Sequence, residues 1–385
     1  MSVTVGIHDL AVATAGHTLA LDALAAYNGT DPGKYRVGLG QDQMSVPGPD
    51  EDIVTMGAAA ARAVLDRHGA DGIRTLLLAT ESGVDQSKAA GVPVHALLGL
   101  PSTCRVVEFK QACYSATAAL QAAAGLIARD RSERVLVIAA DVARYELDSA
   151  AEATQGAGAV AMLVTADPAI AVLEHATGIH TADVDDFWRP NDSPTAVVDG
   201  KLSVEAYLDG IVRAWDDYRA HGGSPIDQID RFCHHQPFTR MAVKAHRRLA
   251  EHVGVALDEG LIDVTTGYNR RIGNSYTASL YLALAALLDG ADDLDGARVG
   301  MFSYGSGAVS EFFSLVVQPG YRSALRGAET EALLAARTPV DVARYRELHA
   351  GAALDSRFDV DTPVDSRGPF RFAGIRGRAR RYAAN

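Results

Sequence analysis

With 385 residues, 48% of them apolar, the chain can fill one large core or two fused cores, so general disorder is excluded. Its formal net charge of −12 disfavours nucleic acid and anionic membranes as main partners. Three cysteines, an N-terminus without a signal-peptide pattern and the lack of a membrane-length apolar run predict a cytoplasmic protein without disulfides.

In chain order, short aliphatic and β-branched runs alternate with longer runs of helical periodicity. This alternation predicts an α/β fold with helices packed against sheets. The predicted strands cover residues 74–80, 104–109, 134–140, 160–165, 298–304 and 312–318, with a shorter strand at 229–233. The predicted helices cover residues 53–68, 113–129, 204–221, 238–252 and 276–290, and we expect the segment from about 338 to wrap around the rest.

Glu81 directly follows the strand predicted at 74–80, at the carboxyl end of that strand. In α/β proteins, catalytic and ligand-binding side chains commonly lie at this end of a strand. A partly desolvated carboxyl group there has a raised pKa and can serve as general acid and base. A solvated loop carboxylate is the alternative that this pattern leaves open.

Cys113 stands at the start of the helix predicted over residues 113–129. We expect the helix dipole at this position to favour the thiolate, the nucleophile that can hold an acyl group as a thioester. A small buried hydrophobe is the commoner role of a free cysteine. A Glu, a His and an Asn elsewhere in the chain stand in settings that complement a reactive cysteine. Their presence favours the role of nucleophile over that of a buried hydrophobe.

The two halves of the chain repeat one order of elements: an Ala-rich helix, a strand, Gly-x-Gly-Ala-Val and another strand. The pentapeptide occurs at residues 156–160 and 305–309, and Cys113 and Ser275 stand at matching places. The period is too long for a solenoid and predicts a duplicated domain. We expect the two helix starts to face each other across a pseudo-twofold axis, which would bring Cys113 and Asn274 into one cleft.

His234 and His235 lie between the short strand and the next helix, where a histidine could donate a hydrogen bond to a substrate carbonyl. Adjacent side chains point in different directions, so at most one of the two faces the site, and the residues alone leave the choice open. A metal site is disfavoured because no suitably spaced ligand accompanies the pair.

Further candidates follow in the second half. Arg240, Lys244 and Arg247 or Arg248 form one basic stripe on the next helix, which either binds phosphate or is merely solvated. Asn274, which could also be a helix cap, and the Gly-rich turn at residues 303–307 could expose polar groups to a ligand oxyanion.

Together these segments resemble the 3-hydroxy-3-methylglutaryl-CoA synthases of the thiolase superfamily, in an order and spacing similar to the bacterial, actinobacterial-type branch. The resemblance covers residues 6–321. Its most specific parts are Ala79-Thr-Glu-Ser82, Lys110-Gln-Ala-Cys-Tyr114, Asp186-Phe-Trp-Arg-Pro190, His235-Gln-Pro-Phe-Thr239, Gly273-Asn-Ser-Tyr276 and Ser303-Tyr-Gly-Ser-Gly307.

The resemblance implies a thiolase-like fold, with two duplicated α/β halves in a layered α-β-α-β-α arrangement. It implies a first half, residues 1–168, that carries Glu81 and Cys113. The second half, residues 169–385, would carry His235, Asn274, Ser306 and the wrap-around tail.

The family pattern also implies roles. It places the acylated nucleophile on Cys113, the general acid and base on Glu81 and the catalytic histidine on His235. Arg240 replaces a Lys common in the family, and Val243 stands where some members carry another Lys; both departures bear on CoA affinity and acyl-carrier choice. The implied substrate or CoA contacts are Asp31, Pro32, Thr154, Ser203, Arg240, Lys244, Asn274 and Ser306.

The reaction that the resemblance implies begins with acetyl transfer from acetyl-CoA to Cys113. Glu81 then removes a methyl proton, while N–H groups of Cys113 and Ser306 stabilise the enolate oxygen. His235, with Asn274 nearby, polarises the ketone of acetoacetyl-CoA, and water releases the product. The CoA thioesters are substrates, so we expect no cofactor and no metal; a homodimer is expected, without nucleic acid or membrane partners.

Four other classes of protein remain alternatives to this family. A polyketide β-branching synthase would take acyl groups from an acyl carrier protein, although the basic stripe favours free CoA. A ketoacyl synthase would not need Glu81, and a thiolase would need a second catalytic Cys that the chain does not evidently offer. A non-catalytic scaffold would usually lose the nucleophile, whereas Cys113, Glu81 and His235 are all present.

Overall fold

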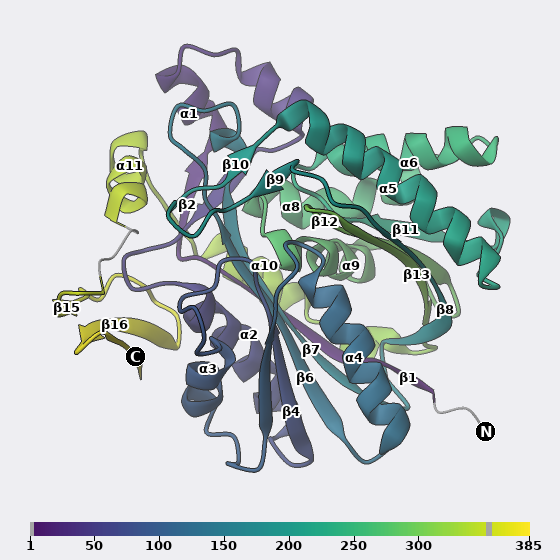
Figure 1. Ribbon diagram of the computed structural model, residues 1–385, viewed down its shortest axis with the longest axis horizontal. Coiled ribbons are helices and arrows are strands. Elements are labelled where there is room, and N and C mark those ends of the chain that lie inside the picture. Colours follow the sequence, from purple (N-terminus) through teal and green to yellow (C-terminus); the bar gives the residue numbers. More distant parts are fainter. Residues whose placement is uncertain (1–3, 352–355) are drawn as a thin grey trace.

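The computed structural model describes residues 4–351 and 356–385, and its main strands form two fans that join in one twisted sheet (Figure 1). The nine strands are hydrogen-bonded in the order β11-β12-β13-β8-β1-β7-β6-β4-β5. Their bounds are β1 Val5–Thr14, β4 Ile73–Ala79, β5 Arg105–Phe109, β6 Arg134–Ala143, β7 Gly156–Ala166, β8 Ala171–Thr181, β11 Arg231–His234, β12 Arg298–Gly305 and β13 Val309–Val317.

The strand pairing shows the duplication. In the first half, β1 is antiparallel to β7, β7 is antiparallel to β6, and β6 is parallel to β4. In the second half, β8, β13, β12 and β11 repeat the same order and the same directions. The two sets meet where β1 and β8 pair antiparallel, with Gly6 opposite Val172. The duplicated layout predicted from the sequence is therefore confirmed.

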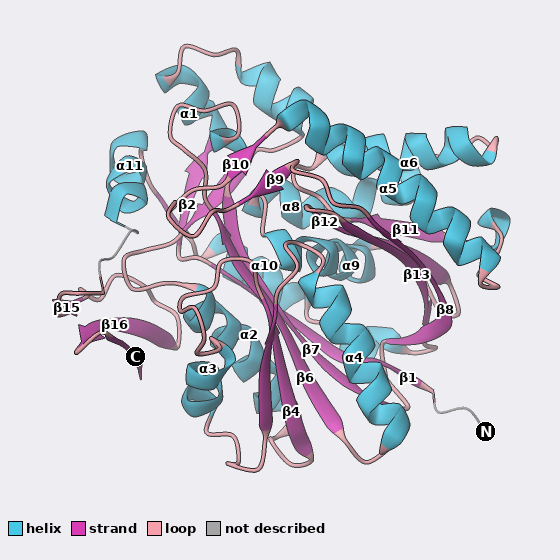
Figure 2. Ribbon diagram, viewed as in Figure 1, coloured by secondary structure: helices cyan, strands magenta, loops and turns pink. Residues whose placement is uncertain are grey.

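Helices cover both faces of each fan, which explains why the strands read as continuous apolar runs. In β6, Val137 faces a core shared with α4 and α9, whereas Ile138 faces a second core shared with α2 and α3. A third core packs α5 and α6 against Phe302 and Phe312 of the other fan. The predicted five-layer α-β-α-β-α arrangement is thus confirmed (Figure 2). These helices are α2 Ile53–His68, α3 Gly91–Leu98, α4 Ser115–Arg129, α5 Gly200–Ala220, α6 Arg240–Val253 and α9 Ser279–Gly290.

The C-terminal segment crosses back onto the first half of the molecule, as expected of a wrap-around tail. β14 pairs with β2, and β16 and β17 lie against α2 and α3 (Figure 1). The remaining elements are β2 His17–Ala20, α1 Leu21–Tyr27, β3 Gln43–Val46, β9 Phe187–Trp188, β10 Val197–Val198, α7 Gly260–Asp263, α8 Gly267–Ile272, α10 Gly327–Ala335, β14 Thr338–Pro339, α11 Val342–Gly351, β15 Val360–Asp361, β16 Phe370–Arg376 and β17 Ala379–Ala384.

Four of the five predicted helices begin at other residues than the sequence predicted. The helices α4, α5, α6 and α9 begin at Ser115, Gly200, Arg240 and Ser279 instead of residues 113, 204, 238 and 276. α4 begins at Ser115 rather than Cys113, because Ala112 has a positive φ of 43° and turns the chain sharply after β5. α9 begins at Ser279 and is preceded by a 3-10 turn at Tyr276–Ala278. Within residues 4–351 and 356–385, no helix has the length and apolarity needed to cross a bilayer.

Candidate active site

A direct hydrogen bond joins the two central groups of the site, Cys113 and Glu81. The Cys113 thiol donates a hydrogen bond of 3.1 Å to Glu81 Oε2. Cys113 lies in the sharp turn between β5 and α4, and Glu81 lies in the loop after β4. Because β5 and β4 are parallel neighbours, their carboxyl ends meet at one edge of the sheet.

Both groups hold their protons more tightly than usual. Burial, and after it the nearby charge of Asp141, raise the pKa of Glu81 from 4.5 to about 8. Burial also raises the pKa of the Cys113 thiol, as does the negative charge of Glu81. The expectation that the helix start favours the thiolate is therefore wrong for this state. Helix α4 begins two residues later, and the thiol faces an acid in a buried setting.

Asp141, at the carboxyl half of β6, braces the Glu81 loop. Its Oδ1 accepts hydrogen bonds from the Glu81 and Ser82 N–H groups and from the Thr80 hydroxyl, and its Oδ2 accepts from Thr277. Asp141 is fully buried, so these bonds replace the water that its carboxylate would otherwise bind. The loop with Glu81 is thereby fixed to the segment that enters α9.

That entry segment, residues 274–279, contacts three parts of the site in turn. The Asn274 side chain donates to the Tyr145 hydroxyl at 3.1 Å, and Tyr145 belongs to the same buried apolar cluster as Cys113. Thr277 binds Asp141, as described above. Ser279 Oγ lies 2.9 Å from His235 Nδ1. One short segment therefore aligns the surroundings of Cys113, Glu81 and His235.

His235 follows β11 and is 2% exposed. Burial lowers the pKa of its imidazole to about 3, so the ring is neutral at physiological pH. Ser279 Oγ already accepts the Gln236 N–H, which leaves the hydroxyl proton for His235 Nδ1. This arrangement favours the tautomer with a proton on Nε2, the nitrogen that can donate to a ligand. His234 instead lies 3.4 Å from the His246 ring, within the core of the second half.

The turn after β12 lies directly against the Cys113 turn. A side chain at Gly305 would meet the Gln111 carbonyl oxygen at 2.5 Å, so only glycine permits this approach. The Ser306 carbonyl accepts the Gln111 side-chain amide at 3.2 Å. Asp186 holds the turn by accepting the Tyr304 hydroxyl and the Gly307 N–H, both at 2.9 Å.

Thr154 supports Asn274 through its backbone, since its carbonyl accepts the Asn274 N–H at 3.0 Å. A side chain at Gly156 would lie 2.6 Å from the Asn274 carbonyl, so β7 also approaches this segment closely. The structure thus brings together six of the predicted residues: Glu81, Cys113, Thr154, His235, Asn274 and Ser306.

The other five predicted residues lie apart from this cluster, on three outer segments. Asp31 and Pro32 precede the π-helical turn Lys34–Leu39, which contacts the start of α6. Ser203 lies in the first turn of α5. Arg240 begins α6, and Lys244 lies one turn later with Nζ 5.4 Å from the Phe238 ring centre. In the described part of the chain, none of the five forms a hydrogen bond or ion pair with Cys113, Glu81 or His235.

Several residues of the site received no role from the sequence. Asp141 follows the strand predicted at 134–140, the same signal that singled out Glu81. For Asp186 the sequence signal is the family motif at residues 186–190, and Ser279 lies inside a predicted helix. For Tyr145 no sequence signal was evident. Among the described residues, no group of three or more His, Cys, Asp and Glu side chains could hold a metal ion.

Comparison with known proteins places these features in a family context. Family models for the N-terminal and C-terminal parts of hydroxymethylglutaryl-coenzyme A synthase match residues 2–169 and residues 170–253 with 257–342. The chain is 39% identical to a hydroxymethylglutaryl-CoA synthase of Enterococcus faecalis, over 98% of this chain and 99% of that protein.

Two further similarities extend the comparison. The chain is 34% identical to the polyketide biosynthesis 3-hydroxy-3-methylglutaryl-ACP synthase PksG of Bacillus subtilis, over 88% of this chain and 87% of that protein. A crystal structure of an HMG-CoA synthase complexed with CoA superposes with a TM-score of 0.94 at 35% identity. That match covers 99% of this chain and all of the other.

Proposed function

Because the chain belongs to the hydroxymethylglutaryl-coenzyme A synthase family, we propose that it condenses acetyl-CoA with acetoacetyl-CoA and water to 3-hydroxy-3-methylglutaryl-CoA and CoA. The observation that carries this proposal is the 3.1 Å contact between the Cys113 thiol and Glu81. A nucleophile and a proton acceptor in direct contact are what an acyl-transfer reaction followed by carbon deprotonation requires.

Acylation begins with loss of the thiol proton, for which Glu81 is the adjacent acceptor. With its pKa raised to about 8, Glu81 is a stronger base than an ordinary carboxylate and can also return a proton near neutral pH. Cys113 attacks the thioester carbon of acetyl-CoA, the C–S bond to CoA breaks, and the leaving thiolate takes up a proton. Acetyl-Cys113 and free CoA result.

Condensation then uses Glu81 as the base that removes a methyl proton from acetyl-Cys113. The resulting enolate oxygen needs hydrogen-bond donors, and the adjoining turns at Cys113 and Ser306 offer backbone N–H groups. His235, neutral and with Nε2 available as a donor, polarises the ketone of acetoacetyl-CoA so that the enolate carbon attacks it. The Asn274 side chain positions the neighbouring wall of the site by its hydrogen bond to the Tyr145 hydroxyl.

The outer residues fit the adenosine and phosphate end of CoA. Arg240 and Lys244 present two cations one helical turn apart, beside the loop that carries Asp31 and Pro32. Cations on a rigid helix are suited to phosphate binding. Ser203 adds a hydroxyl from the first turn of α5.

The test is incubation of the purified protein with acetyl-CoA alone and then with acetoacetyl-CoA, followed by mass analysis of protein and products. We expect an acetyl group on Cys113 in the first step and 3-hydroxy-3-methylglutaryl-CoA in the second. The C113A variant should form neither, while C104S, which changes a partly exposed thiol outside the site, should retain both. A C113A variant that forms product at the wild-type rate would refute the proposal.

A synthase that takes acyl groups from a carrier protein is the second candidate, favoured by the similarity to the polyketide enzyme. The two are separated by comparing acetyl transfer to Cys113 from acetyl-CoA and from an acetylated carrier protein. Retention of Arg240 and Lys244 supports free CoA. A clear kinetic preference for the carrier would support the alternative.

We further propose a cytoplasmic homodimer. β5 is the edge strand of the large sheet, with Val107 40% exposed, and the adjacent face of α4 carries the small residues Ala118, Ala122 and Gly125. An apolar edge strand beside a flat helix face is suited to pairing with a second copy. Light scattering of V107K, which adds a charge at this edge, tests the interface; an unchanged dimer would refute its location.

A further inference from the structure

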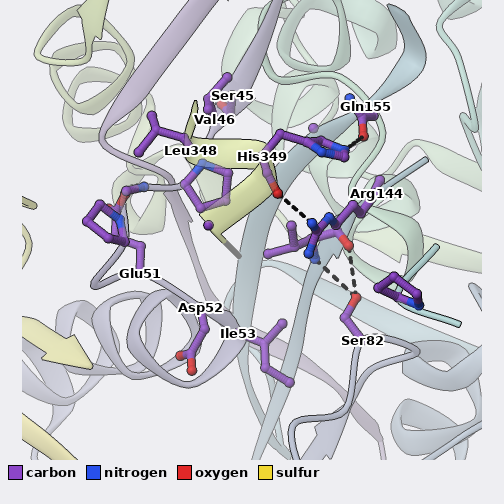
Figure 3. A pocket seen from close by; sticks show the side chains of 18 of the residues that line it. Ser45, Val46, Glu51, Asp52, Ile53, Ser82, Arg144, Gln155, Leu348 and His349 are labelled. Atoms are coloured by element: carbon purple, nitrogen blue, oxygen red, sulfur yellow. Dashed lines mark hydrogen bonds between the residues drawn. The ribbon is translucent and has the colours of Figure 1, made fainter. Parts of the chain in front are cut away.

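A cavity of about 460 Å³ lies between the first half of the molecule and its C-terminal segment. Its walls come from the loop before α2, the ends of β4 and β6, helix α11 and the strands β16 and β17. Figure 3 shows the Arg144 side chain between Ser82 and the His349 backbone, on the wall of this cavity. The volume is sufficient for several waters or a small organic group.

The cavity reaches the catalytic pair from the side of Glu81. Glu81 and Tyr276 line it, whereas none of the other ten predicted site residues does so in the described part of the chain. It is therefore a space distinct from the outer segments that carry Asp31, Ser203, Arg240 and Lys244. A thioester bound by those segments would leave this space open to water.

Four arginines line the cavity, and two of them keep hydrogen-bonding capacity. Arg344 is paired with Glu347 and Asp365, and Arg380 lies 3.8 Å from Asp52. By contrast, the buried Arg144 Nε has no partner among the described residues. The exposed Arg189 forms no ion pair or hydrogen bond there, and its positive charge lowers the pKa of Glu81.

The acidic groups of the cavity wall are already engaged in holding the fold. Glu51 accepts the N–H groups of Gly16 and Gly48. Asp52 caps α2 through the N–H groups of Val54 and Thr55. The groups left to meet a ligand beside Glu81 are therefore cationic, and they suit a carboxylate.

We propose that this cavity supplies the water that cleaves acyl-Cys113 and receives the carboxylate so formed, with Arg189 and Arg144 as its counter-charges. Water adds to the thioester carbon, Glu81 accepts one proton of that water, and the C–S bond breaks. The sulfur takes back a proton as the thiol, and the second water proton is lost as the carboxylic acid ionises. This inference rests on the proposed function and adds to it a separate route for the hydrolytic half of the cycle.

The charge balance explains why cations are required at this point. The new carboxylate forms next to the half-buried Glu81 and near the fully buried Asp141. Like charges at such short range disfavour ionisation of the product. A guanidinium that approaches from the cavity offsets this repulsion, and it can do so without contact with the CoA portion of the substrate.

The experiment compares R189Q, R189K and R344Q with the wild-type protein by time-resolved intact-protein mass spectrometry. R344Q is the matched control, because it removes a charge from the same cavity wall where acidic partners already compensate it. With acetyl-CoA alone, all four proteins should acquire one acetyl group on Cys113 at similar rates. After acetoacetyl-CoA is added, R189Q should accumulate the 3-hydroxy-3-methylglutaryl-enzyme and hydrolyse it about 10- to 100-fold more slowly.

R189K should recover most of the hydrolysis rate, which a merely structural role of Arg189 would not produce. Deacylation of R189Q at the wild-type rate, or equal accumulation in R344Q, would overturn the inference while leaving the proposed function intact. A wild-type protein that never acquires acetyl on Cys113 would instead refute the proposed function.

Discussion

Replacement of Glu81 by glutamine tests the electrostatic coupling at the centre of the site. In the native protein the thiol of Cys113 lies 3.1 Å from Glu81 Oε2. At that distance a thiolate and a carboxylate repel each other by about 5 kcal/mol if the effective dielectric constant is about 20. The E81Q variant removes this repulsion and keeps the size of the side chain, so we expect the pKa of Cys113 to fall.

The assay is the rate of Cys113 alkylation by iodoacetamide at pH 9, where Glu81 is ionised because its pKa is about 8. Only the thiolate reacts, so the rate follows the thiolate fraction. Even a quarter of the calculated repulsion corresponds to about tenfold more thiolate, and we expect E81Q to react at least that much faster. Site-resolved mass spectrometry separates Cys113 from Cys104.

The matched control is E311Q. Glu311 is also a buried acid, but it accepts the hydroxyl of Tyr114 and does not contact the thiol. Its replacement should leave the alkylation rate of Cys113 nearly unchanged. Alkylation of E81Q that is no faster than that of the wild type, or equal acceleration in E311Q, would refute the electrostatic reasoning.

Three further predictions follow from the geometry. Burial raises the pKa of Glu81 above its unfolded value of 4.5 to about 8, so its contribution to stability is complete below pH 4.5 and is lost as the pH rises through 8. Urea unfolding should therefore show E81Q more stable than wild type by up to about 5 kcal/mol at pH 9 and little changed at pH 4. S279A removes the hydroxyl that orients His235 and should slow condensation about 10- to 100-fold without slowing acetyl transfer. S314A, which removes a buried hydroxyl of β13 that bonds Tyr218 and Glu174, should slow neither step. R240Q should raise the KM for acetyl-CoA about tenfold with kcat retained, and R247Q on the same helix should not, because Arg247 is paired with an acid.

Each of these has a contrary result. Equal stability of E81Q and wild type at pH 9 would mean that burial does not raise the pKa of the Glu81 carboxyl group. Loss of acetyl transfer in S279A would place the hydroxyl in the first half-reaction. An unchanged KM in R240Q would remove the start of α6 from the CoA site.

The fold could be predicted from the sequence because its signals are local and occur twice. Apolar runs such as residues 134–140 mark strands buried on both faces, and the repeated Gly-x-Gly-Ala-Val indicates the duplication. Element ends were less certain: the sequence predicted that the helix begins at Cys113, but the positive φ of Ala112 delays it to Ser115. A turn of this kind has no signature in periodicity.

The residues that form the site could be predicted from the sequence only in part. Glu81 follows a strand, and Cys113 precedes an apolar helix, but neither pattern shows that the two side chains touch. Burial of the thiol raises its pKa, and the contact with Glu81, 32 residues away in sequence, raises it as well, which is why the helix-dipole argument gave the wrong direction. The choice of His235 over His234 came from family resemblance; in the structure His235 is bound to Ser279.

The duplication explains why these groups meet at all. The chain enters an apolar helix at the same relative place in each half, at α4 in the first half and at α9 in the second. The turn before α4 and the segment before α9 therefore approach each other where the two fans join. The first half places the Cys113 thiol at this position, and the second places polar side chains that bind Tyr145, Asp141 and His235. A substitution of Thr277, whose hydrogen bond to Asp141 joins the segment before α9 to the Glu81 loop, should therefore disturb both halves of the site at once. A substitution at the start of the outer helix α6 should alter only substrate binding.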